Sequence, residues 1–322
     1  MRKSLVAIMA ALTLVTSEAH SSGPEIPGNA IRIIVPLSAG GPTDVLARVV
    51  SKSLGEKLGV TPYIENKPGA SGLIGTEQVA RSAADGATLL FTATHFVITP
   101  SLYKNVPYDT KKDFSPIALI ATVPNAILVS KDFPAKNIEE LIEILKKNPG
   151  KYSFGSAGTG SANHLSGELF MQMTGVEMTH IPYKGNGPAM NDLIGGHIPI
   201  LFDSLPTAVN AAKGGLVRVL ALTGQKRSQL LPDVPTLDEA GVKGFNVEAW
   251  FGVYMPQAHD SAIYKKLVAA MKDVNESAEL KQKLADMGVT PGTLFGNEFR
   301  VFVDNEIARW GDVVRKANIT PE

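Results

Sequence analysis

The stretch IRIIVPLSAGGPTDVLARVVSKSLGEKLG, residues 31–59, joins a β-branched run, a glycine-rich turn and a helical pattern in direct succession. The run IRIIVP favours a strand. The apolar residues after the turn recur with helical spacing, which predicts a helix over residues 45–58 that Gly59 ends. The same alternation continues with the run TPYIEN, a helix near residues 75–82 and the run ATLLFTA. Strands that alternate with helices are typical of parallel α/β layers, so the sequence predicts an α/β fold.

Two further helices carry clear signals at their ends. Asn137 begins the segment NIEELIEILKKNPG, and Glu140, three residues later, completes a capping-box pattern. Ser277 can cap the segment SAELKQKLADMG, which Gly288 ends. After the run ATLLFTAT we expect a break at Pro100, because proline lacks the N–H that a helix interior needs.

The turn SAGGPTD, residues 38–44, has a second copy, SAGTGSANH, at residues 156–164. Each copy follows a strand-like run and precedes a helical segment. The glycines permit positive φ angles, and the helix N-terminus behind each turn supplies free N–H donors and a partial positive charge. Two such turns that face each other can clamp one small anion from both sides. The alternative is that the glycines and a capping Asp, Ser or Asn only make a tight connection.

A carboxylate suits these turns better than a phosphate. Neither turn has the lysine of a P-loop, and the second turn lacks the full dinucleotide fingerprint. The six histidines show no metal-binding spacing, and no G-x-S-x-G elbow marks a serine hydrolase. We therefore expect a binding protein that is not an enzyme, with no metal and no cofactor.

Several candidate residues have more than one interpretation. Asp44 either contacts the ligand or, as we favour, caps its helix, and Asp203 holds an amino group, orients a water or caps the next helix. His95 and His164 either face the ligand or have structural roles. Arg48 lies a full turn into its helix, so we expect N–H groups and hydroxyls, rather than a salt bridge, to hold the ligand. The predicted ligand-binding residues are Ser38, Ala39, Gly40, Gly41, Thr43, Asp44, Thr94, His95, Ser156, Gly158, Thr159, Gly160, His164, Tyr183 and Asp203.

The length of the chain, 322 residues, exceeds the usual size of one core and favours two domains. The extended runs at residues 117–129 and 247–255 are predicted to cross between two lobes. Lobe 1 then comprises residues 20–124 and 247–322, and lobe 2 comprises residues 125–246. We expect the ligand in the cleft between them, because clefts between domains are common sites for small molecules.

The N-terminal residues predict export. Arg2 and Lys3 precede an apolar run and the small-residue pattern SEA, so we expect residues 1–19 to be removed as a signal peptide and the protein to be periplasmic. The full sequence has 31 cationic and 31 anionic residues. The predicted signal contains two of the cationic residues and one of the anionic residues, so the chain without it has a net charge near −1. Such a surface argues against nucleic acid as a partner. We expect a monomer.

These features together resemble the Bug family, the TctC-like extracytoplasmic solute receptors of tripartite tricarboxylate transporters. The resemblance covers the chain after the signal and rests on the order and spacing of IRIIVPLSAGGPTDVLAR, ENKPGASGLIGTEQVARSAADGATLLF, FSPIALIATVPNAILV, FGSAGTGSANHLSGELF, HIPYKGNGPAMNDLIGGHI and WFGVYMP. It implies a two-lobed periplasmic binding protein, a type II-like Venus flytrap with two crossing strands. It also implies that both glycine-rich turns hold a ligand carboxylate, partly through water. The chain departs from the family's pattern at Leu37-Ser38 and at residues 92–96, so the identity of the carboxylate stays open.

The predicted function is capture of a small mono- or dicarboxylate and its delivery to the membrane subunits of a tripartite tricarboxylate-type transporter. A receptor that feeds a signalling sensor would use the same site. Saturable binding without turnover distinguishes both from an exported hydrolase. A structural surface protein would show neither binding nor turnover.

Overall fold

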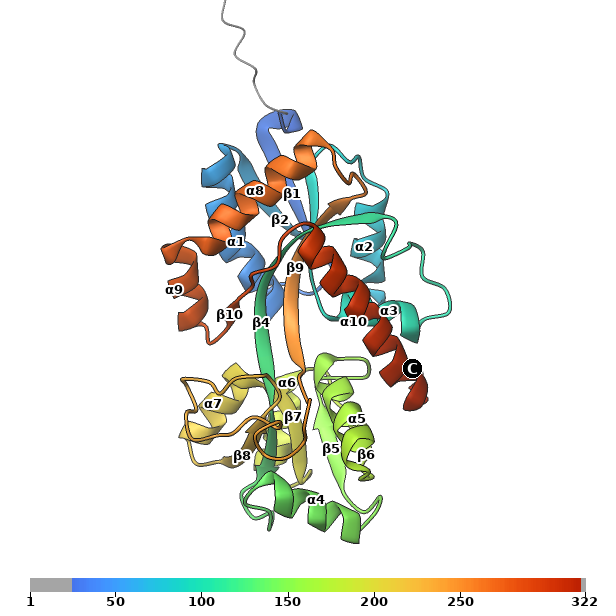
Figure 1. Ribbon diagram of the computed structural model, residues 1–322, viewed down its shortest axis with the longest axis vertical. Helices are drawn as coiled ribbons and strands as arrows, with labels where there is room; N and C mark the ends of the chain where they lie inside the picture. Colours follow the sequence, from blue (N-terminus) through green and yellow to red (C-terminus); the bar gives the residue numbers. More distant parts are fainter. Residues whose placement is uncertain (1–24, 320–322) are drawn as a thin grey trace, which may run out of the picture.

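Strand β4 (Phe114–Ser130) passes through two lobes, which form the upper and lower halves of Figure 1. The computed structural model describes residues 25–319. In the upper half, lobe 1, the first part of β4 pairs antiparallel with β9 (Glu248–Pro256). In the lower half, lobe 2, the end of β4 pairs antiparallel with β7 (Ile200–Ser204) and β8 (Val217–Leu222). One strand therefore belongs to both lobes.

The chain returns from lobe 2 to lobe 1 at the start of β9. Val247 donates its backbone N–H to the carbonyl of Thr223 in lobe 2 at 2.8 Å, and the next residue begins β9. The N–H of Thr223 in turn reaches the carbonyl of Asn125 in β4 at 2.9 Å, so the two chain crossings lie side by side. The residue boundaries of the lobes, 124/125 and 246/247, stay a prediction.

Lobe 1 is a sheet with helices on both faces. Its strands have the order β2-β1-β3-β9-β4, with β10 against β4. The first three pair in parallel, and β9 lies antiparallel between β3 and β4. Besides β4 and β9, the elements of this lobe are β1 (Ala30–Val35), β2 (Thr61–Asn66), β3 (Thr88–Ala93), β10 (Thr290–Pro291), α1 (Pro42–Leu58), α2 (Leu73–Ala80), α3 (His95–Leu102), α8 (Ala262–Glu276), α9 (Ala278–Asp286), α10 (Asn297–Lys316) and the short 3-10 helices at Pro27–Asn29 and Ala70–Gly72.

Lobe 2 continues the same sheet in the order β4-β7-β5-β6, with β8 also against β4. Its remaining elements are α4 (Ile138–Lys147), β5 (Ser153–Ser156), α5 (Ala162–Thr174), β6 (Thr179–Pro182), α6 (Asn186–Ile194) and α7 (Leu205–Lys213). The prediction of parallel layers is thus wrong for part of the sheet, which is mixed. A strand that leaves lobe 1 and a strand that returns to it run in opposite directions, and both lie in the centre of the sheet.

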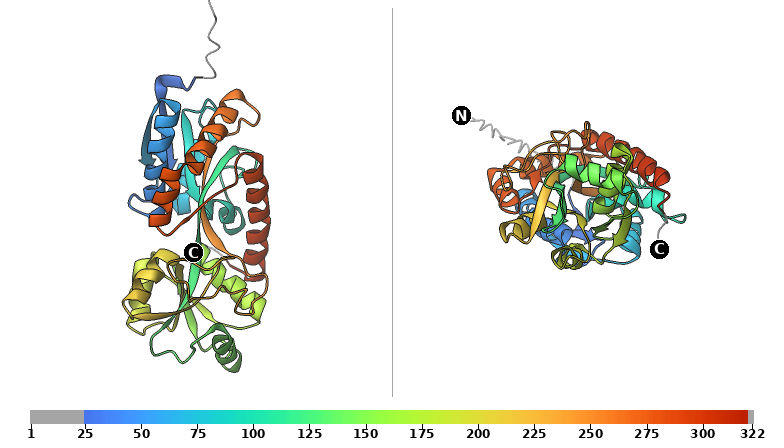
Figure 2. Two further views of the ribbon diagram at one scale, coloured as in Figure 1. Left: turned by 60° about the vertical axis from the view of Figure 1, so that its left-hand side comes forward. Right: turned by 90° about the horizontal axis from the view of Figure 1, so that it is seen from below.

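Helix α10 connects the two lobes along one side, as the left view of Figure 2 shows. It packs on α3 in lobe 1 and on α5 in lobe 2, where Gln172 donates to the carbonyl of Val313 at 3.3 Å.

A buried carboxylate links α10 to β9. Oε2 of Glu306 accepts the indole N–H of Trp250 at 3.0 Å and that of Trp310 at 2.8 Å. The three side chains form one buried polar cluster beside the crossings.

Most of the predicted helix ends are confirmed. Asn137 accepts the N–H of Glu140 at 2.8 Å, Ser277 accepts that of Leu280 at 3.2 Å, and Gly59 ends α1 in a left-handed conformation. The break at Pro100 is wrong, because α3 continues through this residue. The apolar residues of α3 are buried against α10, and this packing outweighs the hydrogen bond that proline cannot donate.

Candidate ligand-binding site

A cavity of 580 Å³ lies between the two lobes. Four helix starts contribute to it, those of α1, α5, α6 and α7, together with β4, β9 and the segment that follows α9. The residues that line it are Gly40, Pro42, Thr43, Val45, Leu46, Val123, Asn125, Asn163, Gly185, Asn186, Ser204, Pro206, Thr207, Ala249, Phe251, Met287 and Val289. Its size suits a small organic molecule.

The first glycine-rich turn reaches this cavity with its own internal brace. The N–H of Gly40, a residue with φ of 81°, donates to Oδ2 of Asp44 at 2.9 Å. Arg48 donates two hydrogen bonds to the same carboxylate, from Nε to Oδ2 at 3.0 Å and from Nη2 to Oδ1 at 2.9 Å. The hydrogen bond from Arg48, with that from Gly40, lowers the pKa of Asp44 to about 2. The predicted capping role of Asp44 is wrong, because Gly41 is the N-cap of α1 and no side chain caps this helix. Asp44 instead braces the turn through Gly40, and Arg48 is bonded to Asp44.

The lobe 2 side of the cavity is a chain of amides and hydroxyls. Nδ2 of Asn186, at the start of α6, donates to Oγ of Ser204 at 3.0 Å, and this hydroxyl lies 3.0 Å from Oγ1 of Thr207 in α7. Nδ2 of Asn163 donates to Oδ1 of Asn125 at 3.2 Å. The first turns of α6 and α7 add backbone N–H groups without intrahelical acceptors. Together these groups form a donor-rich surface at two helix N-termini, which favours an anion.

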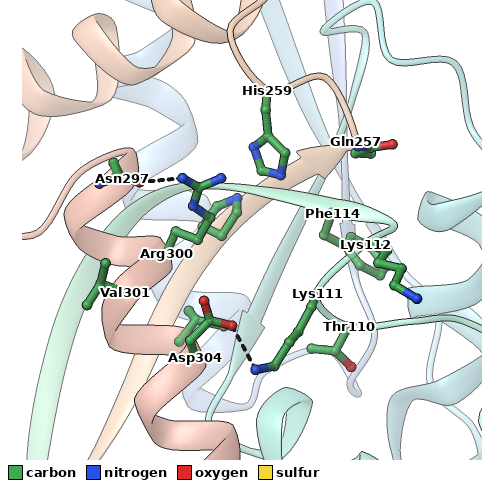
Figure 3. Close-up of a pocket in the computed structure, with 12 residues that line it drawn as sticks. Thr110, Lys111, Lys112, Phe114, Gln257, His259, Asn297, Arg300, Val301 and Asp304 are labelled. Carbon is green, nitrogen blue, oxygen red and sulfur yellow. Dashed lines mark hydrogen bonds and ion pairs between the residues drawn. The ribbon is translucent and has the colours of Figure 1, made fainter.

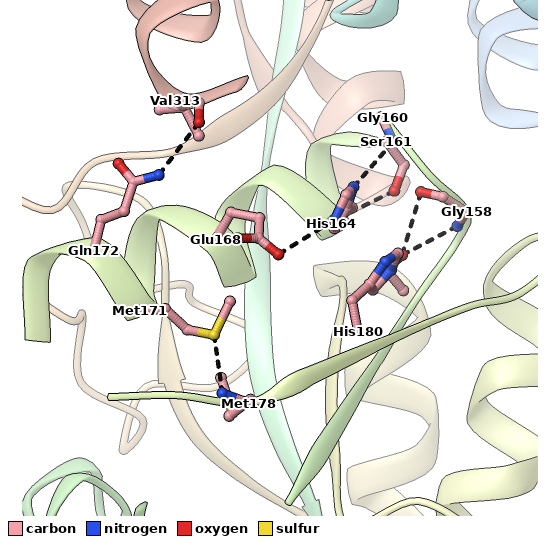
Figure 4. Close-up of polar contacts among 11 residues, drawn as sticks. Gly158, Gly160, Ser161, His164, Glu168, Met171, Gln172, Met178, His180 and Val313 are labelled. Atoms are coloured by element: carbon pink, nitrogen blue, oxygen red, sulfur yellow. Dashed lines mark hydrogen bonds and ion pairs between the residues drawn. The ribbon is translucent and has the colours of Figure 1, made fainter. Parts of the chain in front are cut away.

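Of the second glycine-rich turn, residues 156–164, Asn163 lines the cavity, whereas residues 156–160 are not among the described residues that line it. Oγ of Ser156 lies 2.7 Å from Nε2 of His180, and Gly160 donates its N–H to Nδ1 of His164 at 3.0 Å (Figure 4). The two imidazole rings stack at 3.7 Å between centroids. Burial and the neighbouring His164 lower the pKa of His180 to about 3. A Cβ at Gly160 would strike Leu102 of α3, so this turn also touches lobe 1.

The other predicted site residues have identifiable surroundings. Oγ1 of Thr94 accepts the N–H of Trp250 at 2.8 Å. Burial of the His95 ring lowers its pKa to about 4, and its Nε2 lies 3.3 Å from Oγ1 of Thr92. The hydroxyl of Tyr183 donates to Asp192 at 2.7 Å. Of the predicted set, the cavity lining includes Gly40 and Thr43. A role in binding stays a prediction for all of the set, which further comprises Ser38, Ala39, Gly41, Asp44, Thr94, His95, Ser156, Gly158, Thr159, Gly160, His164, Tyr183 and Asp203.

Asp203 lies at the end of β7, directly before Ser204 of the cavity wall. Its exposed fraction is 0%. Oδ1 accepts the N–H of Ser204 at 2.6 Å, whereas Oδ2 has no hydrogen-bond partner among the described residues. Burial raises the pKa of Asp203 to about 7. The structure thus holds a carboxyl group that is easier to bury protonated than ionised.

Comparison with known proteins decides the family. The model described as "Tripartite tricarboxylate transporter family receptor" (TctC) matches residues 46–319. The chain belongs to this family. Its fold is that of periplasmic solute-binding receptors, and the family is one of receptors rather than enzymes.

The receptor is similar to one relative from Bordetella pertussis and to two solved structures that hold a carboxylate. The receptor is 35% identical to protein BugT of Bordetella pertussis over 297 residues, which cover 92% of this chain and 91% of the relative. It is similar to R. palustris Rpa4515 with adipate, at 35% identity and a TM-score of 0.80, covering 92% of this chain and 100% of the other. It is also similar to MatC (Rpa3494) from Rhodopseudomonas palustris with bound malate, at 32% identity and a TM-score of 0.75, covering 89% and 99%.

A larger cavity of the receptor, 690 Å³, lies on lobe 1 alone (Figure 3). Its cationic groups already have polar partners. Lys111 pairs with Asp304 at 3.0 Å, and Arg300 donates to Oδ1 of Asn297 at 2.5 Å. The cavity between the lobes is the better candidate for a ligand site, because residues of both lobes line it and several helices begin at it.

Residues 25–319 contain no group of three potential metal ligands. Among the helices of the same residues, none has the length and apolar character that a membrane span requires.

We did not predict, from the sequence, the residues of lobe 2 that line the cavity, among them Asn186 and Thr207. The segments KGNGP and DSLPT each follow a strand and open a helix, with Pro188 and Pro206 in the first helical turns. Proline at the start of a helix is a known start signal, and glycine before it lets the backbone approach a ligand. These signals could have identified Asn186 and Thr207.

Replacing Asp203 by Asn should change how the stability of the receptor depends on pH. The unfolded carboxyl group has a pKa near 3.9, and the folded one about 7. Between these values the folded protein keeps a proton that the unfolded chain releases, so the free energy of unfolding falls as the pH rises from about 4 to about 7. Asp203→Asn removes this titration. Urea unfolding at pH 5 and pH 8 measures the free energy of unfolding of both proteins. From pH 5 to pH 8 the difference between variant and wild type should shift in favour of the variant by on the order of 2 kcal/mol. Parallel pH profiles would contradict the raised pKa.

Proposed function

We propose that the receptor captures a small carboxylate in the cavity between its lobes and delivers it to the membrane subunits of a tripartite tricarboxylate-type transporter. The observation that carries this proposal is the convergence of the starts of α1, α6 and α7 on one interlobe cavity. Adipate and malate in the two similar structures support a carboxylate as the ligand. Function in the periplasm is part of the proposal, since the predicted signal at residues 1–19 lies outside the described residues.

The carboxylate would be held without a salt bridge. Asn186, Ser204 and Thr207 offer amide and hydroxyl groups from lobe 2. The first glycine-rich turn offers the N–H and hydroxyl of Thr43 from lobe 1, because the N–H of Gly40 is bonded to Asp44. Hydrogen bonds to a carboxylate are charge-assisted and short, so several of them can replace a cation. Contribution of the second turn, residues 156–160, would complete the clamp when the lobes close, and it stays a prediction.

Ligand contacts on both lobes should shift the receptor toward a closed form, because such a ligand binds the closed form better. The test is small-angle scattering and thermal unfolding of the periplasmic protein with adipate, malate and shorter or longer carboxylates. A binding carboxylate should lower the radius of gyration and raise the unfolding temperature; saturation at one hundred times Kd stabilises by about 2.7 kcal/mol. The matched primary amides are the control and should do neither. If no carboxylate in a broad set changes either quantity, the proposal is wrong.

A further inference from the structure

The cavity between the lobes has one polar side and one apolar side. Its polar side chains come mainly from lobe 2 and the crossing, as described above for Asn186, Ser204, Thr207 and Asn125. Its apolar side chains come from lobe 1, from α1, β4, β9 and the segment after α9. They include Val45, Leu46, Val123, Phe251, Met287 and Val289.

The apolar side is available to a ligand. Val45 keeps an exposed fraction of 39% although it lies on the first turn of α1, at the cavity. Met287 is also partly exposed, whereas Phe251 and Val289 are largely buried and line the cavity with their remaining surface. A ligand that covers these side chains removes apolar surface from water on both partners, which favours binding.

Charged side chains do not occur among the cavity-lining residues that the structure describes. A ligand with one carboxylate can place it between Thr43 of the first glycine-rich turn and the donor-rich starts of α6 and α7, which uses the donors of both lobes. A second carboxylate, or an ammonium group, would then lie against the apolar side and lose hydration without an oppositely charged partner. The affinity of the cavity for a ligand should therefore depend on whether the end remote from the carboxylate is charged or uncharged.

We infer that the ligand is a monocarboxylate with an uncharged, apolar body. Its carboxylate lies toward Asn186 and Thr207, and its body packs on Val45, Phe251 and Met287. This inference rests on the proposed capture of a carboxylate, and it makes the receptor differ in preference from the similar proteins that hold adipate and malate.

Three molecules of equal chain length test the inference by calorimetry on the periplasmic protein. Hexanoate, adipate and 6-aminohexanoate differ only at the far end, which carries a methyl, a carboxylate or an ammonium group. Hexanoate should bind at least about tenfold more tightly than the other two, since each would bury an unpaired charge. From butyrate to hexanoate, each methylene should raise the affinity by about three- to fourfold.

Val45→Thr tests the apolar side itself with a substitution of equal shape. It should lower the affinity for hexanoate about three- to tenfold and leave that for acetate nearly unchanged. Val301→Thr on α10, also a surface valine with 52% exposure, is the matched control and should change neither affinity.

The measured affinities distinguish a wrong ligand class from a wrong function. Tighter binding of adipate or 6-aminohexanoate than of hexanoate would overturn the inference and leave carboxylate capture standing. Equal binding of hexanoate by the wild type and Val45→Thr would also overturn it. If none of these acids binds, and no other carboxylate does, the inference and the proposed function are both wrong.

Discussion

Replacing Asn186 by Asp should lower the affinity of the receptor for its carboxylate ligand at least about 100-fold. Asn186 is the first residue of α6 and lines the cavity, and its amide donates to Ser204 of the same cavity wall. The variant loses an N–H donor and places a negative charge beside the ligand's own. Two like charges about 4 Å apart near a protein surface repel by up to about 4 kcal/mol, which exceeds the roughly 2.7 kcal/mol that a 100-fold change requires.

The helix dipole favours an acidic residue at this N-terminus. Asn186 also lies beside the buried carboxyl of Asp203, so the thermal unfolding of Asn186→Asp is measured together with its affinity. Asn297→Asp is a matched control. Asn297 is the first residue of α10, and like Asn186 it follows a glycine at the N-cap, but it lies outside the cavity. Calorimetry should show wild-type affinity for this control. Unchanged affinity in Asn186→Asp would mean that the carboxylate lies elsewhere in the receptor.

Replacing Glu306 by Ala should lower the free energy of unfolding by about 3–5 kcal/mol. Glu306 is buried and accepts the indole N–H groups of Trp250 and Trp310 with one oxygen. Its other oxygen lies 3.4 Å from Nη1 of Arg309. The truncation leaves two buried donors without an acceptor and opens a cavity beside the crossings. Urea unfolding monitored by tryptophan fluorescence measures the loss.

Glu306→Gln is the matched variant for this experiment. Its amide oxygen can still accept both indole N–H groups, so it should cost less, about 1–2 kcal/mol. A comparable loss in both variants would show that the charge beside Arg309, rather than the two indole bonds, stabilises this cluster. A negligible loss in Glu306→Ala would contradict the structural role assigned to the cluster.

The parts of the fold that depend on local signals could be predicted from the sequence. Asn137 caps its helix as its neighbour Glu140 indicates, and Gly59 ends α1 because only a left-handed residue closes that turn. Pro100 shows the limit of such reasoning. Its local preference is to break a helix, but contact between α3 and α10, remote in sequence, decides the outcome.

The candidate site shows a similar division. The first glycine-rich turn was identified because its strand, turn and helix are contiguous, and Gly40 and Thr43 do line the cavity. The second turn has almost the same sequence pattern, but the pattern does not state which way the turn faces. Its direction depends on the neighbours that it meets in the fold, here His180 and Leu102. The lobe 2 wall depends on how β7 pairs with β4, which the sequence does not reveal.

The position of β9 between β3 and β4 has a consequence for the order in which the chain can fold. The strands that β9 joins are complete by residue 130, but β9 itself begins at residue 248. All of lobe 2 is synthesised in the interval. Until β9 arrives, β3 and the first part of β4 each have an unpaired edge, and such edges invite association with other chains. Lobe 2 can form earlier from nearer contacts, whereas lobe 1 must wait for the last quarter of the polypeptide.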